Sequence, residues 1–276
     1  MVIESKKIIR NDRRTPDQLR PVSFSRGISE FAAGSFLFEL GKTKVLCAVT
    51  LQNGVPPFLR GKNVGWLTAE YALLPTSTAT RTQREGSLMN KNGRSVEIAR
   101  FIGRCFRSIV DLSLIGERTI TIDCDVLQAD GSTRTAAITG SFLALEMAQE
   151  KWLQSRMINQ PFIKERIAAI SVGVVKEHVF LDLNYEEDSV ATADFNFVIT
   201  QSDKIIEMQG GAESTPLDWD MFEDVRMMAC HGIKQLFALC EHNKQEKQEV
   251  LSQKSTKTSE ERVPMFSLQN RQKSLS

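Results

Sequence analysis

Five carboxylates lie in the stretch DLNYEEDSVATADFNF, residues 182–197, with apolar, strand-like sequence on both sides of it. Two of the five, Asp188 and Asp194, stand six positions apart around the small polar segment SVATA. If this segment is a bend between strands, both carboxylates can point into one cleft, and paired oxygen ligands suit Mg²⁺ or Mn²⁺. The alternative is a solvated acidic turn, and the residues alone leave both interpretations open.

The segment DGSTRTAA, residues 130–137, joins the end of a predicted strand to the start of a predicted helix. Free backbone N–H groups and the helix dipole attract an anion at such a position. Ser132 and Thr133 add hydroxyl donors, and Arg134 adds a guanidinium that can bind two phosphate oxygens at once. This chemistry is right for a phosphate site, and an ordinary helix N-cap with a solvated Arg134 is the alternative.

A basic patch lies between residues 60 and 107, where nine lysines and arginines accompany three glutamates. The whole chain has a net charge of only +1, so a polyanion such as a phosphodiester backbone must bind to a local cluster of this kind. The alternative is a solvated helix face with internal ion pairs, such as Glu97 with Arg100 or Arg104. The residues predicted to bind the nucleic acid are Arg81, Arg84, Lys91, Arg100, Arg104 and Arg107.

Together, a phosphate-binding turn, a basic patch and a carboxylate pair indicate phosphoryl or nucleotidyl transfer on a nucleic acid. The sequence lacks the motif GxxxxGK followed by Ser or Thr, which argues against a P-loop nucleoside triphosphatase. Five cysteines without a CxxC pair argue against a disulfide framework or a zinc site. Because no apolar run approaches the roughly 20 residues of a membrane span and the N-terminus lacks a signal-peptide pattern, we expect a cytoplasmic protein without a membrane segment.

The elements that must position these residues are predicted from hydrophobic periodicity and turn residues. Their order predicts an α+β domain of two related halves over residues 1–241, with a long polar loop over 76–94. The Lys-, Gln- and Ser-rich segment 242–276 is predicted to be disordered. Strands are predicted over 35–52 (two, around a Gly41-Lys42 turn), 64–75, 118–131, 167–183 and 193–210, and helices over 95–112, from Ser132 onward, and over 219–240.

Six ordered sequence blocks carry a resemblance to a known family. They are DQLRPV (17–22), GKTKVLCAVT (41–50), GWLTAEYALLP (65–75), GERTITIDCDVLQADGSTRTAAITG (116–140), DLNYEEDSVATADFNFV (182–198) and MQGGAESTP (208–216). Together they resemble ribonuclease PH, a family of phosphorolytic exoribonucleases also called tRNA nucleotidyltransferases. The resemblance implies an α+β ribonuclease PH fold, like domain 2 of ribosomal protein S5, with two related βα halves. It also implies a homohexamer assembled as a trimer of dimers.

The same resemblance implies a reaction and roles for the candidate residues. Inorganic phosphate, as co-substrate, attacks the 3′-terminal phosphodiester of RNA, chiefly precursor tRNA, and reversibly releases a nucleoside diphosphate. Asp188 and Asp194 correspond to the catalytic aspartates of the family, which are thought to hold a divalent metal, Mg²⁺ or Mn²⁺. The phosphate-binding residues correspond to Arg94, Ser132, Thr133 and Arg134.

The sequence also departs from the family pattern. Ser132 stands where the family usually has a glycine, Arg13 where it tends to have a glycine, and Thr76 where it often has an arginine. If Ser132 requires a positive φ, the serine costs roughly 1 kcal/mol. Two other functions stay open: a catalytically silent RNA-binding ring subunit of an exosome-like assembly, and a hydrolytic metal-dependent nuclease. The remaining acids of the 182–197 stretch are either close neighbours of the site or solvated charges.

Overall fold

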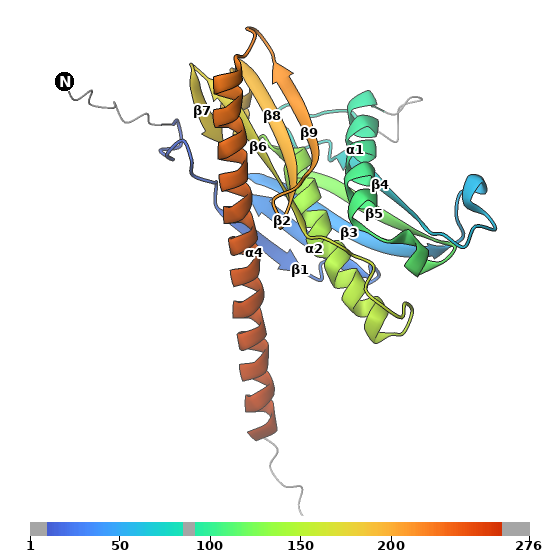
Figure 1. Cartoon of the computed structure of the whole chain (residues 1–276). Helices are drawn as coiled ribbons and strands as arrows, with labels where there is room; N and C mark the ends of the chain where they lie inside the picture. The colour runs from blue at the N-terminus through green and yellow to red at the C-terminus, as the bar shows by residue number, and fades with distance from the viewer. Residues whose placement is uncertain (1–9, 85–91, 261–276) are drawn as a thin grey trace, which may run out of the picture. The chain divides into compact units, whose positions relative to one another are not determined.

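The computed structural model describes residues 10–84 and 92–260, and side chains up to residue 241 (Figure 1). The chain divides into two compact units, Met1–Phe237 and Ala238–Ser276. All the predicted site residues belong to the first unit, which contains two β-sheets, one for each predicted half. The predicted α+β fold class is confirmed.

The first half contains a five-stranded sheet with the strand order β1-β2-β3-β5-β4. The predicted turn between β2 and β3 is confirmed, because Gly41 adopts a φ of 58° between Leu40 and Thr43. Neighbouring strands are antiparallel except for β4 and β5, which are parallel. The strands are β1 (Val22–Arg26), β2 (Gly34–Leu40), β3 (Thr43–Asn53), β4 (Trp66–Leu73) and β5 (Arg118–Gln128).

Helix α1 (Gly93–Ile109) supplies the crossover that the parallel pair β4 and β5 requires. It begins two residues before the predicted start, because the Asn92 side chain accepts a hydrogen bond from the backbone N–H of Arg94 and caps the helix. The predicted apolar stripe is confirmed, and it packs against β4. Its buried members are Ile98, Phe101, Ile102, Cys105, Phe106 and Ile109.

The second half contains an antiparallel sheet with the order β7-β6-β8-β9. One face of this sheet packs against the N-terminal part of α4, through Val172 and Phe197 on the sheet and Val225 and Ile233 on the helix. A four-residue helix, α3 (Tyr185–Asp188), connects β7 to β8. The strands are β6 (Ile167–Val175), β7 (His178–Leu181), β8 (Ala193–Thr200) and β9 (Ile205–Ala212).

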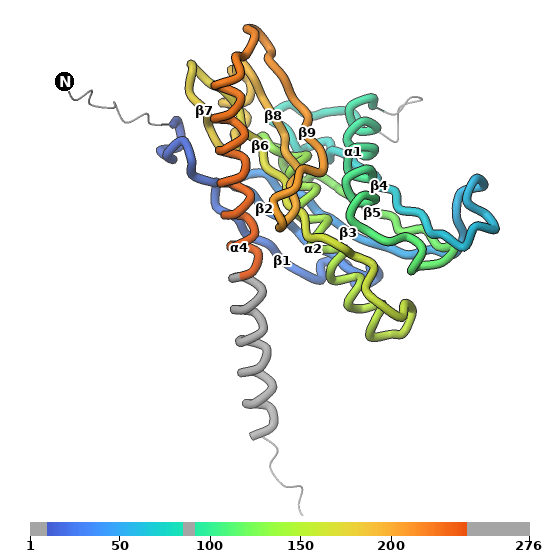
Figure 2. The backbone as a smooth tube through the Cα atoms, viewed as in Figure 1, coloured from blue at the N-terminus to red at the C-terminus, as the bar shows by residue number. Residues whose placement is uncertain are grey.

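Helix α2 (Thr133–Gln154) contacts both sheets, as the tube in Figure 2 allows the reader to follow. Residues 135–145 of the helix are all buried, which explains why the sequence shows no single apolar stripe there. Gly140 permits the close approach of β2 and β3, since a Cβ on it would lie 2.8 Å from the Cβ of Phe38 and 2.9 Å from the Sγ of Cys47. The N-terminus of α2 is therefore held at a fixed place between the halves.

Helix α4 (Trp219–Glu260) continues well past residue 240, where the sequence predicts its end. Residues 261–276 lie outside the described part of the chain, and disorder of the segment 242–276 stays a prediction. Within the described residues, none of the helices is long and apolar enough to cross a membrane.

Candidate active site

The predicted phosphate turn lies between the end of β5 and the start of α2. Ser132 has a φ of 56°, so the residue does adopt the left-handed conformation that the family's glycine favours. Its hydroxyl makes no capping bond to α2 and lies 2.6 Å from the Ser171 Oγ and 3.0 Å from the Leu183 carbonyl oxygen. The hydroxyl thus contacts the second half, and its predicted donation toward a phosphate stays a prediction.

Thr133, the first residue of α2, has a hydroxyl that can donate a hydrogen bond to an anion. The Tyr71 hydroxyl donates to its Oγ1 at 2.9 Å, which leaves the Thr133 hydrogen available for another acceptor. Burial raises the pKa of Tyr71 to about 12, so the phenol stays protonated and remains the donor.

Arg134 is held from two sides at the start of α2. Its Nη1 donates to the Gln209 Oε1 at 2.7 Å on β9 and lies 3.4 Å from the Glu97 Oε1 on α1. The alternative pairing of Glu97 with Arg100 or Arg104 is thus replaced by an ion pair with Arg134. These contacts use one nitrogen of Arg134, Nη1, and a guanidinium has further N–H groups that can bind an anion.

Asp188 and Asp194 come from different elements, the last residue of α3 and the second residue of β8. Partial burial and the neighbouring charge of Asp194 raise the pKa of Asp188 above its usual value. Partial burial and the charge of Glu213 do the same for the pKa of Asp194. The positive charges of Arg94 and Arg134 act to lower the pKa of both aspartates. Both arginines are therefore near enough to interact electrostatically with Asp188 and Asp194.

The sheet leaves room around Asp194. Its cross-strand neighbours are Gly173 on β6 and Gly211 on β9, so no side chain stands beside it on either strand. A Cβ placed on Gly211 would meet nothing within 4 Å. The space is therefore open beside Gly211, whereas the Leu183 side chain fills the space over Gly173, where a Cβ would lie 2.3 Å from its Cδ1.

The donor set fits a hard divalent cation. Two carboxylates that repel each other favour a cation between them, and oxygen ligands are those that Mg²⁺ and Mn²⁺ prefer. Among residues 10–84 and 92–260, no group of three or more His, Cys, Asp or Glu side chains is suited to a metal. Water and phosphate oxygens would therefore have to complete the coordination of a metal at this pair.

The other acids of the 182–197 stretch have different roles. Asp182 is fully buried and accepts hydrogen bonds from Arg20, while Glu187 is 4% exposed and pairs with Arg10. Glu187 also forms a capping box with Asn184 at the start of α3. These buried ion pairs were not predicted, because the arginines lie more than 160 residues away in the sequence.

The arginines of the predicted RNA-binding patch also differ in their surroundings. Arg104 pairs with Glu207 at 2.5 Å, and the Arg107 guanidinium lies 4.7 Å from the centre of the Trp66 ring. These two arginines therefore make internal contacts, and their binding of RNA stays a prediction. Lys91 lies outside the described residues, and the predicted RNA-binding arginines that are exposed are Arg81, Arg84, Arg100 and Arg104.

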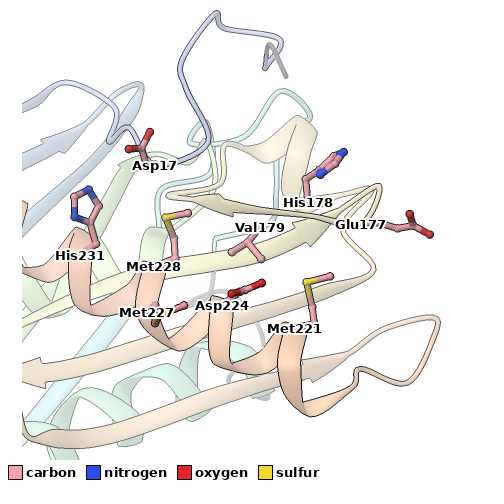
Figure 3. Close-up of a pocket in the computed structure, with 9 residues that line it drawn as sticks. All are labelled: Asp17, Glu177, His178, Val179, Met221, Asp224, Met227, Met228 and His231. Carbon is pink, nitrogen blue, oxygen red and sulfur yellow. The ribbon is translucent and has the colours of Figure 1, made fainter. Parts of the chain in front are cut away.

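A separate pocket lies between β7 and the first turns of α4 (Figure 3). None of the predicted site residues lines it. The residues around it are Asp17, Glu177, His178, Val179, Met221, Asp224, Met227, Met228 and His231.

The sequence comparisons agree with this geometry. Residues 18–150 match domain 1 of the 3′ exoribonuclease family, and residues 165–232 match its domain 2. The chain therefore belongs to the 3′ exoribonuclease family. Within that family it is 47% identical over 234 residues to the ribonuclease PH of Tropheryma whipplei (strain Twist), across 84% of this chain and 95% of that protein. The resemblance to ribonuclease PH is confirmed, and this identity supports phosphorolytic 3′ exoribonuclease activity.

Solved structures show the same fold at lower identity. The crystal structure of rice (Oryza sativa) Rrp46 aligns with a TM-score of 0.67 at 21% identity, over 83% of this chain and 97% of that chain. The Archaeoglobus fulgidus exosome with RNA bound to the active site aligns with a TM-score of 0.70 at 21% identity, over 83% and 92% of the two chains.

Proposed function

We propose that this chain is a tRNA nucleotidyltransferase, which trims the 3′ end of precursor tRNA by phosphorolysis. A phosphate oxygen forms a bond to the terminal phosphorus, the bond from that phosphorus to the 3′ oxygen breaks, and the shortened RNA keeps a 3′ hydroxyl. The product released is a nucleoside diphosphate. The observation that supports the proposal is that the charges of Arg94 and Arg134 act on both Asp188 and Asp194 in a chain with this family's fold.

The first task of such a site is to overcome repulsion between two anions, the phosphate and the RNA backbone. Arg94 and Arg134 carry positive charge, and the N-terminus of α2 adds backbone N–H groups and the positive end of the helix dipole. Phosphate is itself the nucleophile, so no side chain has to attack. Positioning and electrostatic stabilisation supply the rate in such a mechanism.

Asp188 and Asp194 would hold Mg²⁺ or Mn²⁺. A bound divalent ion supplies positive charge that stabilises the scissile group and the departing 3′ oxygen. The chain's own contribution would be the placement of the two carboxylates, one in α3 and one in β8, where the charges of the same two arginines act on both.

The RNA is proposed to approach along the exposed arginines next to α1. Arg81, Arg84 and Arg100 have exposed side chains that suit phosphate contacts, and Lys91 is proposed to join them. The exosome structures that share the fold are assemblies, and we propose for this chain a homohexamer built as a trimer of dimers.

The decisive experiment is product analysis. The protein is incubated with a 3′-extended tRNA precursor and Mg²⁺, with and without inorganic phosphate. Phosphate-dependent release of nucleoside diphosphates supports the proposal. Release of nucleoside monophosphates, or digestion that ignores phosphate, would support a hydrolytic nuclease instead.

One variant separates the enzyme from a catalytically silent RNA-binding subunit. Arg134→Ala removes a charge that acts on both aspartates, so turnover should be lost while RNA still binds. Unchanged turnover in this variant would contradict the role given to Arg134. Absence of turnover in the wild-type protein together with tight RNA binding would favour the silent subunit.

A further inference from the structure

Asp182 is a fully buried aspartate at the end of β7, and it has a φ of 53°. Its carboxylate accepts three hydrogen bonds from Arg20, from the backbone N at 2.9 Å, from Nε at 2.9 Å and from Nη2 at 2.7 Å. The Ser132 hydroxyl lies 3.3 Å from the Asp182 Oδ1. The proposed mechanism gives no part to this carboxylate.

Asp182 and Ser132 are both in the left-handed conformation, and they come from different halves of the fold. A non-glycine residue keeps this conformation only where its surroundings determine it, and such residues cluster at functional sites. Here the two contact each other, so the strain is located at the boundary between the phosphate turn and the second half.

The backbones also approach closely at this boundary. A Cβ on Gly131 would lie 2.5 Å from the Leu183 carbonyl oxygen and 2.8 Å from the carbonyl carbon of Asn184. The Tyr185 backbone N–H donates to the Asp130 Oδ1 at 3.4 Å. The phosphate turn therefore packs directly on the segment that leads into α3.

Arg20 connects the two sides of this boundary. Its Nη1 donates to the Asp130 carbonyl oxygen of the turn, while its other nitrogens hold Asp182. Arg20 is 4% exposed, so water does not compete for these bonds. The segment from Asp182 then leads, six residues later, to Asp188.

We propose that Arg20 and Asp182 are positioning residues that fix the phosphate turn relative to Asp188. This inference rests on the proposed function, in which phosphate on the turn attacks a phosphodiester held near the aspartates. Reacting atoms must lie about 3–3.5 Å apart, and a misplacement of about 1 Å costs on the order of 10²-fold in rate. The turn and α3 come from different halves. A contact that spans the two halves is therefore needed to set the distance between the phosphate on the turn and the phosphodiester near the aspartates.

The test is the variant Arg20→Lys. Lysine keeps the positive charge beside Asp182 but cannot hold both Asp182 and the Asp130 carbonyl oxygen, because it lacks the planar fork of arginine. We expect kcat/KM for phosphate to fall by roughly 30-fold or more, with contributions from both kcat and KM. Phosphate affinity without RNA, measured by calorimetry, should fall as well.

A matched control is Arg118→Lys. Like Arg20, Arg118 joins two segments of the chain, here through the backbone carbonyl oxygens of Ile115 at 2.5 Å and Met157 at 2.9 Å. It lies at the other end of β5, about 30 Å along the strand from the turn. Arg118→Lys should lower the unfolding midpoint while kcat and KM for phosphate stay at their wild-type values.

The outcomes separate this inference from the proposed function. If the wild-type protein releases no nucleoside diphosphate, the proposed function fails. If the wild-type protein is phosphorolytic and Arg20→Lys behaves like Arg118→Lys, with lower stability and unchanged phosphate kinetics, the positioning role is overturned. Should Arg20→Lys not fold, Ser132→Ala removes the contact with Asp182 from the other side, and an unchanged KM for phosphate would then overturn the role.

Discussion

Two pairs of carboxylates lie close together in the sequence but have opposite surroundings in the folded chain. Asp182 and Glu187 are buried against arginines, whereas Asp188 and Asp194 are partly open and lie near other acids. Burial works to raise the pKa of Asp182, but the charge and hydrogen bonds of Arg20 outweigh it and hold that pKa below its usual value. The pKa values of Asp188 and Asp194 are raised. The first pair has its charges matched by arginines, and the second is the pair for which we propose a divalent cation.

The largest expected effect comes from the open pair. Asp194→Asn should lower the rate of phosphorolysis by about 10²–10³-fold, because it removes one of the two carboxylates proposed to hold the divalent cation that stabilises the transition state. The fold should stay intact, with an unfolding free energy within about 0.5 kcal/mol of the wild-type value. Rate assays over a Mg²⁺ series and urea unfolding measure the two quantities. Full activity at low Mg²⁺ would contradict the metal role.

The same substitution in the buried pair should have a different effect. Asp182→Asn removes the buried charge that pairs with Arg20 at 2.7 Å and with Arg14 at 3.5 Å, and breaking a buried pair costs about 3–5 kcal/mol of unfolding free energy. Urea unfolding of the two asparagine variants, side by side, checks the comparison. Equal stabilities of Asp182→Asn and Asp194→Asn would show that the two pairs do not differ as described.

The buried pair also predicts a pH dependence. Because the folded pKa of Asp182 is below its unfolded value of about 3.9, its contribution to stability is present above that pH and is lost as the pH falls through the folded pKa. The urea midpoint of the wild-type protein should therefore fall below about pH 4. Asp182→Asn should show a smaller fall, and an identical pH profile in both proteins would contradict the assignment.

A smaller effect is expected at Gln209, which holds Arg134 beside the open pair. Gln209→Leu removes a hydrogen bond to a charged group, worth about 1.5–3 kcal/mol, and should raise KM for phosphate by about tenfold or more. Gln235→Leu is the matched control on α4, where it removes a hydrogen bond to the Asp17 carbonyl oxygen. Equal KM values in the two variants would contradict the role of Gln209.

The smallest effect is expected at Ser132. Ser132→Gly relieves the left-handed strain, about 1 kcal/mol, and loses hydroxyl hydrogen bonds worth about as much, so stability should change by less than about 1 kcal/mol. Ser132→Ala loses the bonds and keeps the strain, and it should be the less stable of the two in urea unfolding. The reverse order would show that glycine relieves no strain at this left-handed position.

Local patterns predicted the elements that position the site. The Gly41 turn, the apolar stripe of α1 and the strand-to-helix junction before Thr133 depend on neighbouring residues, and all three are confirmed. Strand β1 and helix α3 were not predicted, because each is too short to show a period. The position of Ser132 was predicted, whereas the direction of its hydroxyl was not.

The long-range ion pairs were beyond the reach of sequence patterns. Arg10 and Arg20 contact acids 177 and 162 residues away, and no spacing rule connects them. The Glu97 prediction was wrong for a related reason. Helical spacing favours a partner on the same helix, but Arg134 on α2 lies closer to the Glu97 carboxylate.

The position of helix α2 has a consequence for the cooperativity of unfolding. The Thr139 hydroxyl accepts a hydrogen bond from the Ala169 backbone N–H on β6, while the Cys124 Sγ on β5 lies 3.1 Å from the Ser141 Oγ. One buried helix thus belongs to the interior of both halves. If the chain were cut in the connection between α2 and β6, the sheet of the second half would be separated from a helix that forms part of its core. The two halves should consequently unfold together, and the amide protons of α2 should exchange with solvent only through global unfolding.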